Sequence, residues 1–184
     1  MHLVRPAAEH LPSYVAALER GWSPDNVRGI IASREELAHI EADAAAFLAS
    51  MDDLEGKGDP IHLPDNTIAR RLPGFHRWMW DGEFVGSIGF RWDPGTTDLP
   101  PHCLGHVGYA VVPWKRQRGY ATEALRLLLP ELKFTGLAFV EITTNADNLP
   151  SQRVVEGNGG VLYERFDKPA AYGGGAALRY RIAL

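Results

Sequence analysis

The sequence predicts an α/β fold, with a mixed, mostly antiparallel central sheet of six to seven strands and helices on both faces. Three observations support this prediction. Two amphipathic helical patterns open the chain, aromatic-rich and alternating runs follow, and two further helical patterns are interleaved with the later strands. From residue 75 onward the order is ββ-β-α-β-α-ββ, which allows helices to cover each face of one sheet.

The first 51 residues predict a short strand and two helices. Residues 3–5 can form the strand, and a helical pattern covers residues 6–19. Ser33 and Glu36 have the spacing of a capping box, which predicts that a second helix starts there. The apolar face of this second helix is formed by Leu37, Ile40, Ala44, Phe47, Leu48 and Met51.

The middle and the end of the chain predict the sheet. Residues 52–73 are rich in proline, glycine and acidic residues, and we interpret them as a loop that flanks an active site, because the preceding part is too short to be a domain. Asp81 and Gly82 separate two aromatic-rich runs and predict a β-hairpin. The remaining predictions are strands at 106–112, 138–144, 160–165 and 178–184, and helices at 122–133 and 151–156.

The composition is typical of a single globular domain spanning residues 1–184. With 45% hydrophobic residues the chain can bury a continuous core. The formal net charge of −4 provides no basic field for nucleic acid, so we expect no nucleic-acid partner. Cys103 is the single cysteine, which rules out an intrachain disulfide and favours a cytoplasmic location. No run of about 18 apolar residues occurs, so we expect no membrane association.

The turn after the strand at 106–112 is the most informative segment. Pro113 cannot donate to a strand ladder and ends the strand, while the next helical pattern begins only several residues later. Gly119 allows a close approach of the backbone, and the amides at the start of the helix favour an anion. Arg116 and Arg118 add positive charge, so we predict a pyrophosphate ligand. The turn contains neither a P-loop nor a dinucleotide-binding glycine motif.

These residues resemble a known family. Residues 116–121, Arg-Gln-Arg-Gly-Tyr-Ala, are similar to the signature of the GCN5-related N-acetyltransferase (GNAT) superfamily, in which Gln or Arg is followed by two variable residues, Gly, a variable residue and Gly or Ala. A second block, residues 148–160, resembles the family's downstream element, which begins with Asn and has Ser or Ala three residues later. The resemblance covers about residue 75 to the C-terminus and points to a poorly characterised bacterial subgroup. The first 70 residues match only in layout.

The resemblance implies the GNAT-like acyl-CoA N-acyltransferase fold and an acetyl-CoA-dependent N-acetyltransferase without a metal. The acetyl group would move to a primary amine of a small molecule or peptide by direct attack. Main-chain groups of Tyr109 and Val111 would pair with the pantetheine arm, Asn148 would hydrogen-bond it, and Ser151 would lie nearby. The pyrophosphate would be held by Arg116, Gln117, Arg118, Gly119, Tyr120, Ala121 and Thr122.

The same resemblance suggests catalytic groups. The N–H of Tyr109 would stabilise the oxyanion, and His106 is a candidate base, because an unperturbed histidine has a pKa of about 6.5. A structural, hydrogen-bonded histidine is the alternative. Glu141 and Glu83 are further candidates for the base.

One position departs from the pattern of the family. Many relatives have a tyrosine seven residues after the conserved asparagine, as acid to the thiolate, and this chain has Val155 there. Tyr163, Tyr172 or water could supply the proton instead.

The acceptor and two alternative functions stay open. The acidic loop residues Asp52, Asp53, Glu55, Asp59 and Asp65 would suit a cationic amine, or are simply solvated. Trp78, Trp80, Trp92 and Trp114 could line an acceptor pocket or pack in the core. The alternatives are a catalytically idle acyl-CoA-binding or regulatory module, and a phosphate-binding domain unrelated to acetyl transfer. The alternating tail at 178–184 would permit a homodimer.

Overall fold

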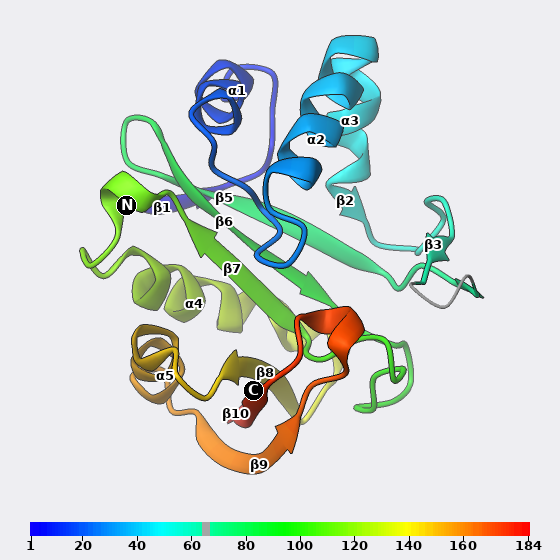
Figure 1. Ribbon diagram of the computed structural model, residues 1–184, viewed down its shortest axis with the longest axis vertical. Helices are drawn as coiled ribbons and strands as arrows, with labels where there is room; N and C mark the ends of the chain where they lie inside the picture. Colours follow the sequence, from blue (N-terminus) through cyan, green and yellow to red (C-terminus); the bar gives the residue numbers. More distant parts are fainter. Residues whose placement is uncertain (64–66) are drawn as a thin grey trace.

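Two antiparallel sheets form the centre of the computed structural model, which describes residues 1–63 and 67–184 (Figure 1). The first sheet comprises β1 His2–Val4, β2 Asp52–Asp53, β5 Gly74–Trp80, β6 Phe84–Arg91 and β7 Val107–Val111. Its order is β1-β5-β6-β7, and β2 pairs with β5. The second sheet has the order β8-β10-β9, from β8 Phe139–Asn145, β9 Val161–Asp167 and β10 Ala176–Ala183. The short strands β3 Ile61–His62 and β4 Ile68–Ala69 pair within the loop at 52–73. The predicted fold class is confirmed, although the strands divide into two sheets.

Helices cover both faces of the first sheet. The helices α1 Leu11–Glu19, α2 Ile30–Ala42 and α3 Ala44–Ser50 lie on one side, while α4 Tyr120–Glu131 and α5 Leu149–Glu156 lie on the other (Figure 1). Each face therefore has its own apolar core. One core contains Tyr14, Trp22 and Trp78. The other contains Leu125, Leu128 and Ile142.

Strand β6 is buried along almost its whole length because it lies between β5 and β7 and beneath helices on both sides. Its pairing with β7 requires a close approach at Gly86. A Cβ atom at this position would lie 2.5 Å from the carbonyl oxygen of Ala110, so a larger residue would push the two strands apart.

The expected start of the second helix is wrong. Helix α2 begins at Ile30, so Ser33 lies inside it, and its hydroxyl donates a hydrogen bond to the carbonyl oxygen of Trp22 at 2.7 Å. The helical stretch is also broken once. Asp43 has an extended backbone, and its side chain accepts a hydrogen bond from the N–H of Ala46 at 2.9 Å, which caps α3.

The two sheets meet where β7 and β8 begin. The N–H of His106 donates to the carbonyl oxygen of Glu141 at 2.8 Å. Beyond this point β7 pairs with β6, and β8 pairs with β10. One edge of β7 is therefore left without a partner strand among the described residues, and this edge positions the candidate site.

Candidate functional site

The unpaired edge of β7 carries the main-chain groups of its odd-numbered residues. The N–H of Arg91 donates to the carbonyl oxygen of His106 at 2.9 Å, and the N–H of Val112 donates to the carbonyl oxygen of Val85 at 3.0 Å. In an antiparallel ladder the direction of these groups alternates along the strand, so the even-numbered residues face β6. The N–H and C=O groups of Tyr109 and Val111 therefore face away from β6. The Nε of Arg116 donates to the Val111 oxygen at 3.3 Å.

The turn that follows β7 exposes a series of amides. Gln117 has a φ of 62° and Gly119 a φ of 79°, which place two residues of the turn in the left-handed region immediately before α4. The first hydrogen bond of the helix runs from the N–H of Glu123 to the oxygen of Gly119 at 3.0 Å. The main-chain N–H groups of residues 117–122 have no acceptor within the described part of the chain. Open amides at a helix N-terminus form a site for an anion.

Asn148 forms the N-cap of α5. Its side-chain oxygen accepts a hydrogen bond from the N–H of Ser151 at 3.1 Å, which leaves the amide nitrogen of Asn148 without an acceptor among the described residues. The capping role and a free amide donor therefore coexist. The phenol of Tyr109 crosses from β7 to this helix, where its oxygen lies 2.7 Å from the hydroxyl oxygen of Ser151. The structure thus brings Tyr109, Asn148 and Ser151 together.

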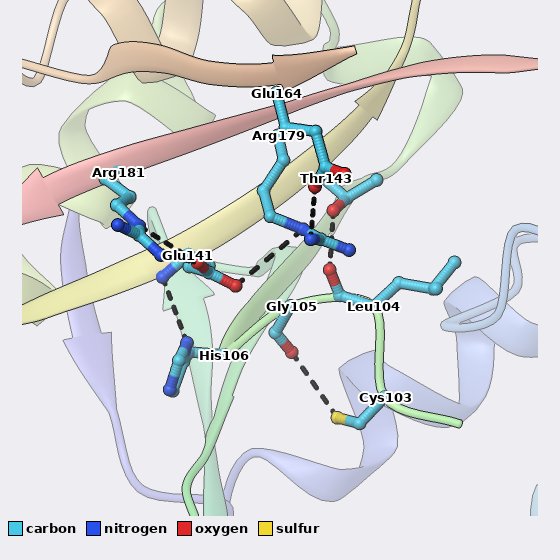
Figure 2. A network of polar contacts seen from close by, with 9 residues as sticks. All are labelled: Cys103, Leu104, Gly105, His106, Glu141, Thr143, Glu164, Arg179 and Arg181. Atoms are coloured by element: carbon cyan, nitrogen blue, oxygen red, sulfur yellow. Dashed lines mark hydrogen bonds and ion pairs between the residues drawn. The ribbon is translucent and has the colours of Figure 1, made fainter. Parts of the chain in front are cut away.

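His106 is fully buried at the junction of the two sheets (Figure 2). Its Nδ1 accepts a hydrogen bond from the N–H of Glu141 at 3.0 Å, so the neutral ring carries its proton on Nε2. Burial, together with the charge of Arg91, lowers the pKa of His106 to about 4. Neither ring nitrogen is free to take a proton, and this geometry favours a structural role over that of a base.

The carboxylate of Glu141 points away from the imidazole of His106 and toward two arginines (Figure 2). Its Oε1 accepts from Nε and Nη2 of Arg181 at 3.0 and 2.9 Å, and the Nε of Arg179 lies 3.7 Å from its Oε2. The network borders a cavity of about 660 Å³ between the loop at 98–104 and strands β8, β9 and β10. Glu141 is therefore committed to ion pairs. Glu83 lies in the β5–β6 hairpin, where it pairs with Lys115.

The position at which many relatives have a tyrosine belongs to the core. Val155 has no exposed surface and packs among residues of α4 and the second sheet. Tyr163 lies on β9, where its ring is 3.4 Å from the guanidinium carbon of Arg181. Tyr172 lies in the short turn of residues 170–172 between β9 and β10.

The acidic residues of the loop at 52–73 are mostly engaged within the protein. Asp52 pairs with Arg5 and Arg77. Asp53 accepts hydrogen bonds from the amides of residues 57 and 58 at 2.9 and 2.8 Å. Glu55 pairs with Lys57, and Asp65 lies outside the described residues.

The tryptophans considered for an acceptor pocket mostly pack. Trp78 and Trp92 are buried in the core. Trp114 lies beneath the guanidinium of Arg20, 3.8 Å from its carbon, and Trp80 contacts the ring of His10.

Sequence reasoning missed a partly buried pair of acidic groups, Tyr14 and Glu36, on the other face of the first sheet. The hydroxyl of Tyr14 donates to the carboxylate of Glu36, and burial raises the pKa of Glu36 to about 7. The helical spacing placed both residues in helices, but their meeting depends on how α1 packs against α2. Among the described residues, no group of three or more His, Cys, Asp and Glu side chains could hold a metal ion, and no helix could cross a membrane.

Comparisons with known proteins show the family and the fold of this chain. Residues 3–161 match the family model described as "Acetyltransferase (GNAT) domain". The microcin C7 self-immunity acetyltransferase MccE, solved with acetyl-CoA and AMP, is similar with a TM-score of 0.64 and 13% identity, over 99% of this chain and 91% of that chain. RimL, a ribosomal L7/L12 alpha-N-protein acetyltransferase solved with coenzyme A, gives 0.62 and 12%, over 99% and 93%.

A third solved structure is that of an acetyltransferase from Salmonella typhimurium that modifies the N-terminal serine of L7/L12. It has a TM-score of 0.58 and 15% identity, over 99% of this chain and 94% of that chain. At these identities the likeness shows the fold. Comparison with curated protein sequences finds no match.

Proposed function

Because the chain belongs to the GNAT acetyltransferase family, we propose that it transfers the acetyl group of acetyl-CoA to a primary amine of a small molecule or peptide. The observation that carries this proposal is the series of open amides at residues 117–122, at the start of α4. These amides lie next to an unpaired strand edge, and the two features together suit a ligand with a pyrophosphate and an extended amide arm.

The residues present fit the donor. The amides of the turn would donate hydrogen bonds to the pyrophosphate oxygens, and the exposed Arg116 and Arg118 would supply the opposite charge. The pantetheine arm would pair with Tyr109 and Val111 as an added strand does. The free amide nitrogen of Asn148 would donate to the same arm from the opposite side. Gln117, Gly119, Tyr120, Ala121 and Thr122 complete the proposed pyrophosphate site.

The reaction needs a hydrogen-bond donor for the oxyanion, and it needs no nucleophilic group of the enzyme. The amine attacks the acetyl carbonyl directly, and the N–H of Tyr109, which faces the unpaired edge of β7, would donate to the developing oxyanion. Such a donor typically lowers the activation barrier by about 2.7–4 kcal/mol. We assign no general base, because the lone pair of His106 Nδ1 accepts from the N–H of Glu141 and the carboxylate of Glu141 is paired with Arg181.

Two measurements test the proposal. We expect CoA to raise the melting temperature of the protein, and a panel of amines and N-terminal peptides to release free thiol from acetyl-CoA only when a suitable acceptor is present. Peptides belong in the panel because similar structures include ribosomal-protein acetyltransferases.

The alternatives give different results. Protection by CoA without acceptor-dependent thiol release would favour an idle acyl-CoA-binding or regulatory module. A lack of protection by CoA, together with protection by inorganic pyrophosphate, would favour a phosphate-binding domain unrelated to acetyl transfer.

A further inference from the structure

The thiolate of CoA, the leaving group of the proposed reaction, has no hydrogen-bond donor at residue 155, where many relatives have a tyrosine. When the amine attacks, a C–N bond forms, the C–S bond breaks and its electron pair goes to sulfur. Val155 is an apolar residue of the core with no exposed surface, so helix α5 presents no phenol at this place. A hydrogen-bond donor placed beside the sulfur would stabilise the charge that develops there.

Most of the other tyrosines are held elsewhere. The hydroxyl of Tyr120 donates to Asp81 in the β5–β6 hairpin, and that of Tyr180 donates to Glu156 at the end of α5. Tyr14 is bonded to Glu36 on the opposite face of the first sheet. Tyr163 stacks on Arg181 at the second sheet, and Tyr172 lies in the β9–β10 connection. Tyr109 is the tyrosine whose phenol reaches the first turn of α5.

The position of the Tyr109 phenol coincides with the proposed path of the pantetheine arm. The main chain of Tyr109 faces the unpaired edge of β7, and its side chain extends to Ser151, whose N–H is bonded to the Asn148 side chain. Two hydrogen bonds, both through Ser151, therefore connect the phenol to the side-chain amide of Asn148, which we assign to the other side of the pantetheine arm. A ligand held between the β7 edge and Asn148 would pass this hydroxyl.

We propose that the phenol of Tyr109 donates a hydrogen bond to the departing sulfur and so stabilises the thiolate. This inference rests on the proposed function. The amine releases its proton to solvent, the phenol keeps its own, and the thiolate takes a proton from water.

The contact with Ser151 is compatible with this role. Either hydroxyl can be the donor in the 2.7 Å contact, so Ser151 can donate to the phenol oxygen. The phenol hydrogen then has only a long contact of 3.3 Å to the main-chain oxygen of Ser151, which it would exchange for the sulfur. Burial raises the pKa of Tyr109 to about 12, so the phenol remains a donor throughout the pH range in which a thiolate forms.

The test measures the pKa of the CoA thiol when CoA is bound. The full-length protein is saturated with CoA, the ultraviolet absorbance of the thiolate is followed against pH, and the ligand-free titration is subtracted so that Cys103 cancels. We expect a pKa at least about one unit lower in the wild type than in Tyr109→Phe, with CoA affinity changed by less than about threefold. Turnover should fall by about tenfold in Tyr109→Phe, with little change in KM for acetyl-CoA.

Two further variants separate the phenol from its neighbours. Ser151→Ala leaves the phenol in place and should keep the thiol pKa low, and Tyr163→Phe is the matched control for loss of a phenol outside the site. The proposal is overturned if Ser151→Ala raises the thiol pKa as much as Tyr109→Phe does, because the serine is then the donor.

The wild type alone also decides the question, even if Tyr109→Phe does not fold. A bound thiol with the same pKa as free CoA overturns the role of Tyr109 while leaving CoA binding intact. Failure of CoA to bind the wild type overturns the proposed function itself, and the role of Tyr109 with it.

Discussion

Gly160 packs directly against Val155, at the end of the turn that connects α5 to β9. A Cβ atom at residue 160 would lie 2.4 Å from Cγ1 of Val155 and 2.8 Å from its carbonyl oxygen. The N–H of Gly160 also donates to that oxygen at 3.0 Å. The absence of a side chain at 160 and the small residue at 155 therefore depend on each other.

We predict that Gly160→Ala destabilises the protein by about 1–3 kcal/mol, because the backbone must move away from Val155. Urea denaturation measures this free energy of unfolding. Gly108→Ala is the matched control, because a Cβ there would have its nearest contact at 3.6 Å, from Arg91. Equal stability of the two variants would mean that the turn relaxes without strain.

The burial of His106 predicts acid lability. Its pKa is lowered from 6.5 to about 4 in the folded protein, so the neutral ring is favoured and the associated stability is present above pH 6.5. This stability is lost as the pH falls toward 4, by about 2 kcal/mol at pH 5. In His106→Asn the side-chain oxygen can still accept from Glu141 but does not titrate. From pH 7.5 to pH 5 the urea midpoint should therefore decrease more in the wild type than in His106→Asn. A parallel decrease in both proteins would contradict the assignment.

Glu36 predicts the opposite dependence on pH. Its pKa is raised from 4.5 to about 7, so the protonated form is favoured, and the associated stability is present below pH 4.5 and lost as the pH rises through 7. We compare the free energy of unfolding of Glu36→Gln with that of the wild type at each pH. Between pH 4.5 and pH 8 this difference should shift in favour of Glu36→Gln by about 1–3 kcal/mol. Thermal melts at the two pH values measure this change. Glu35→Gln, which removes an exposed ion pair with Arg28, should change stability by less than about 1 kcal/mol at either pH.

The turn before α4 gives a prediction for binding. Gly119→Asp places a carboxylate beside the proposed pyrophosphate, and CoA affinity should fall by about tenfold or more. The residue is in the left-handed conformation, which aspartate tolerates, and a Cβ there meets nothing within 4 Å. Gly136→Asp has the same properties beyond the end of α4 and should leave affinity unchanged. Calorimetric titration with CoA compares the two, and equal affinities would rule out a pyrophosphate at the turn.

The sequence predicted the parts of the fold that depend on local pattern. Pro113 and Gly119 mark the end of β7 and the start of α4, and Asp81-Gly82 marks the hairpin. The capping box at Ser33 and Glu36 was wrong because both side chains find partners outside their own helix, Trp22 and Tyr14. Local spacing carries no information about such tertiary contacts.

In the candidate site, too, local pattern predicts some features, while others depend on tertiary contacts. The open turn follows from residue types, and the alternating tail implies that Arg179 and Arg181 share a face of β10. Their pairing with Glu141 depends on the register of β10 against β8, which places Arg181 opposite Glu141. The contact between Tyr109 and Ser151 depends on where α5 docks relative to the unpaired edge of β7. Neither relationship is contained in the spacing of residues along the chain.

The hydrogen bond from Arg116 to the carbonyl oxygen of Val111 has a consequence for how the donor would enter. In the proposed function the same oxygen pairs with the pantetheine arm, so the incoming molecule would compete with an internal partner for it. A displaced Arg116 guanidinium would then be available to the phosphates of the proposed ligand. Binding of CoA would thus replace one acceptor of Arg116, the Val111 oxygen, with another, the phosphates. The free energy measured for CoA binding would then be the difference between these two arrangements.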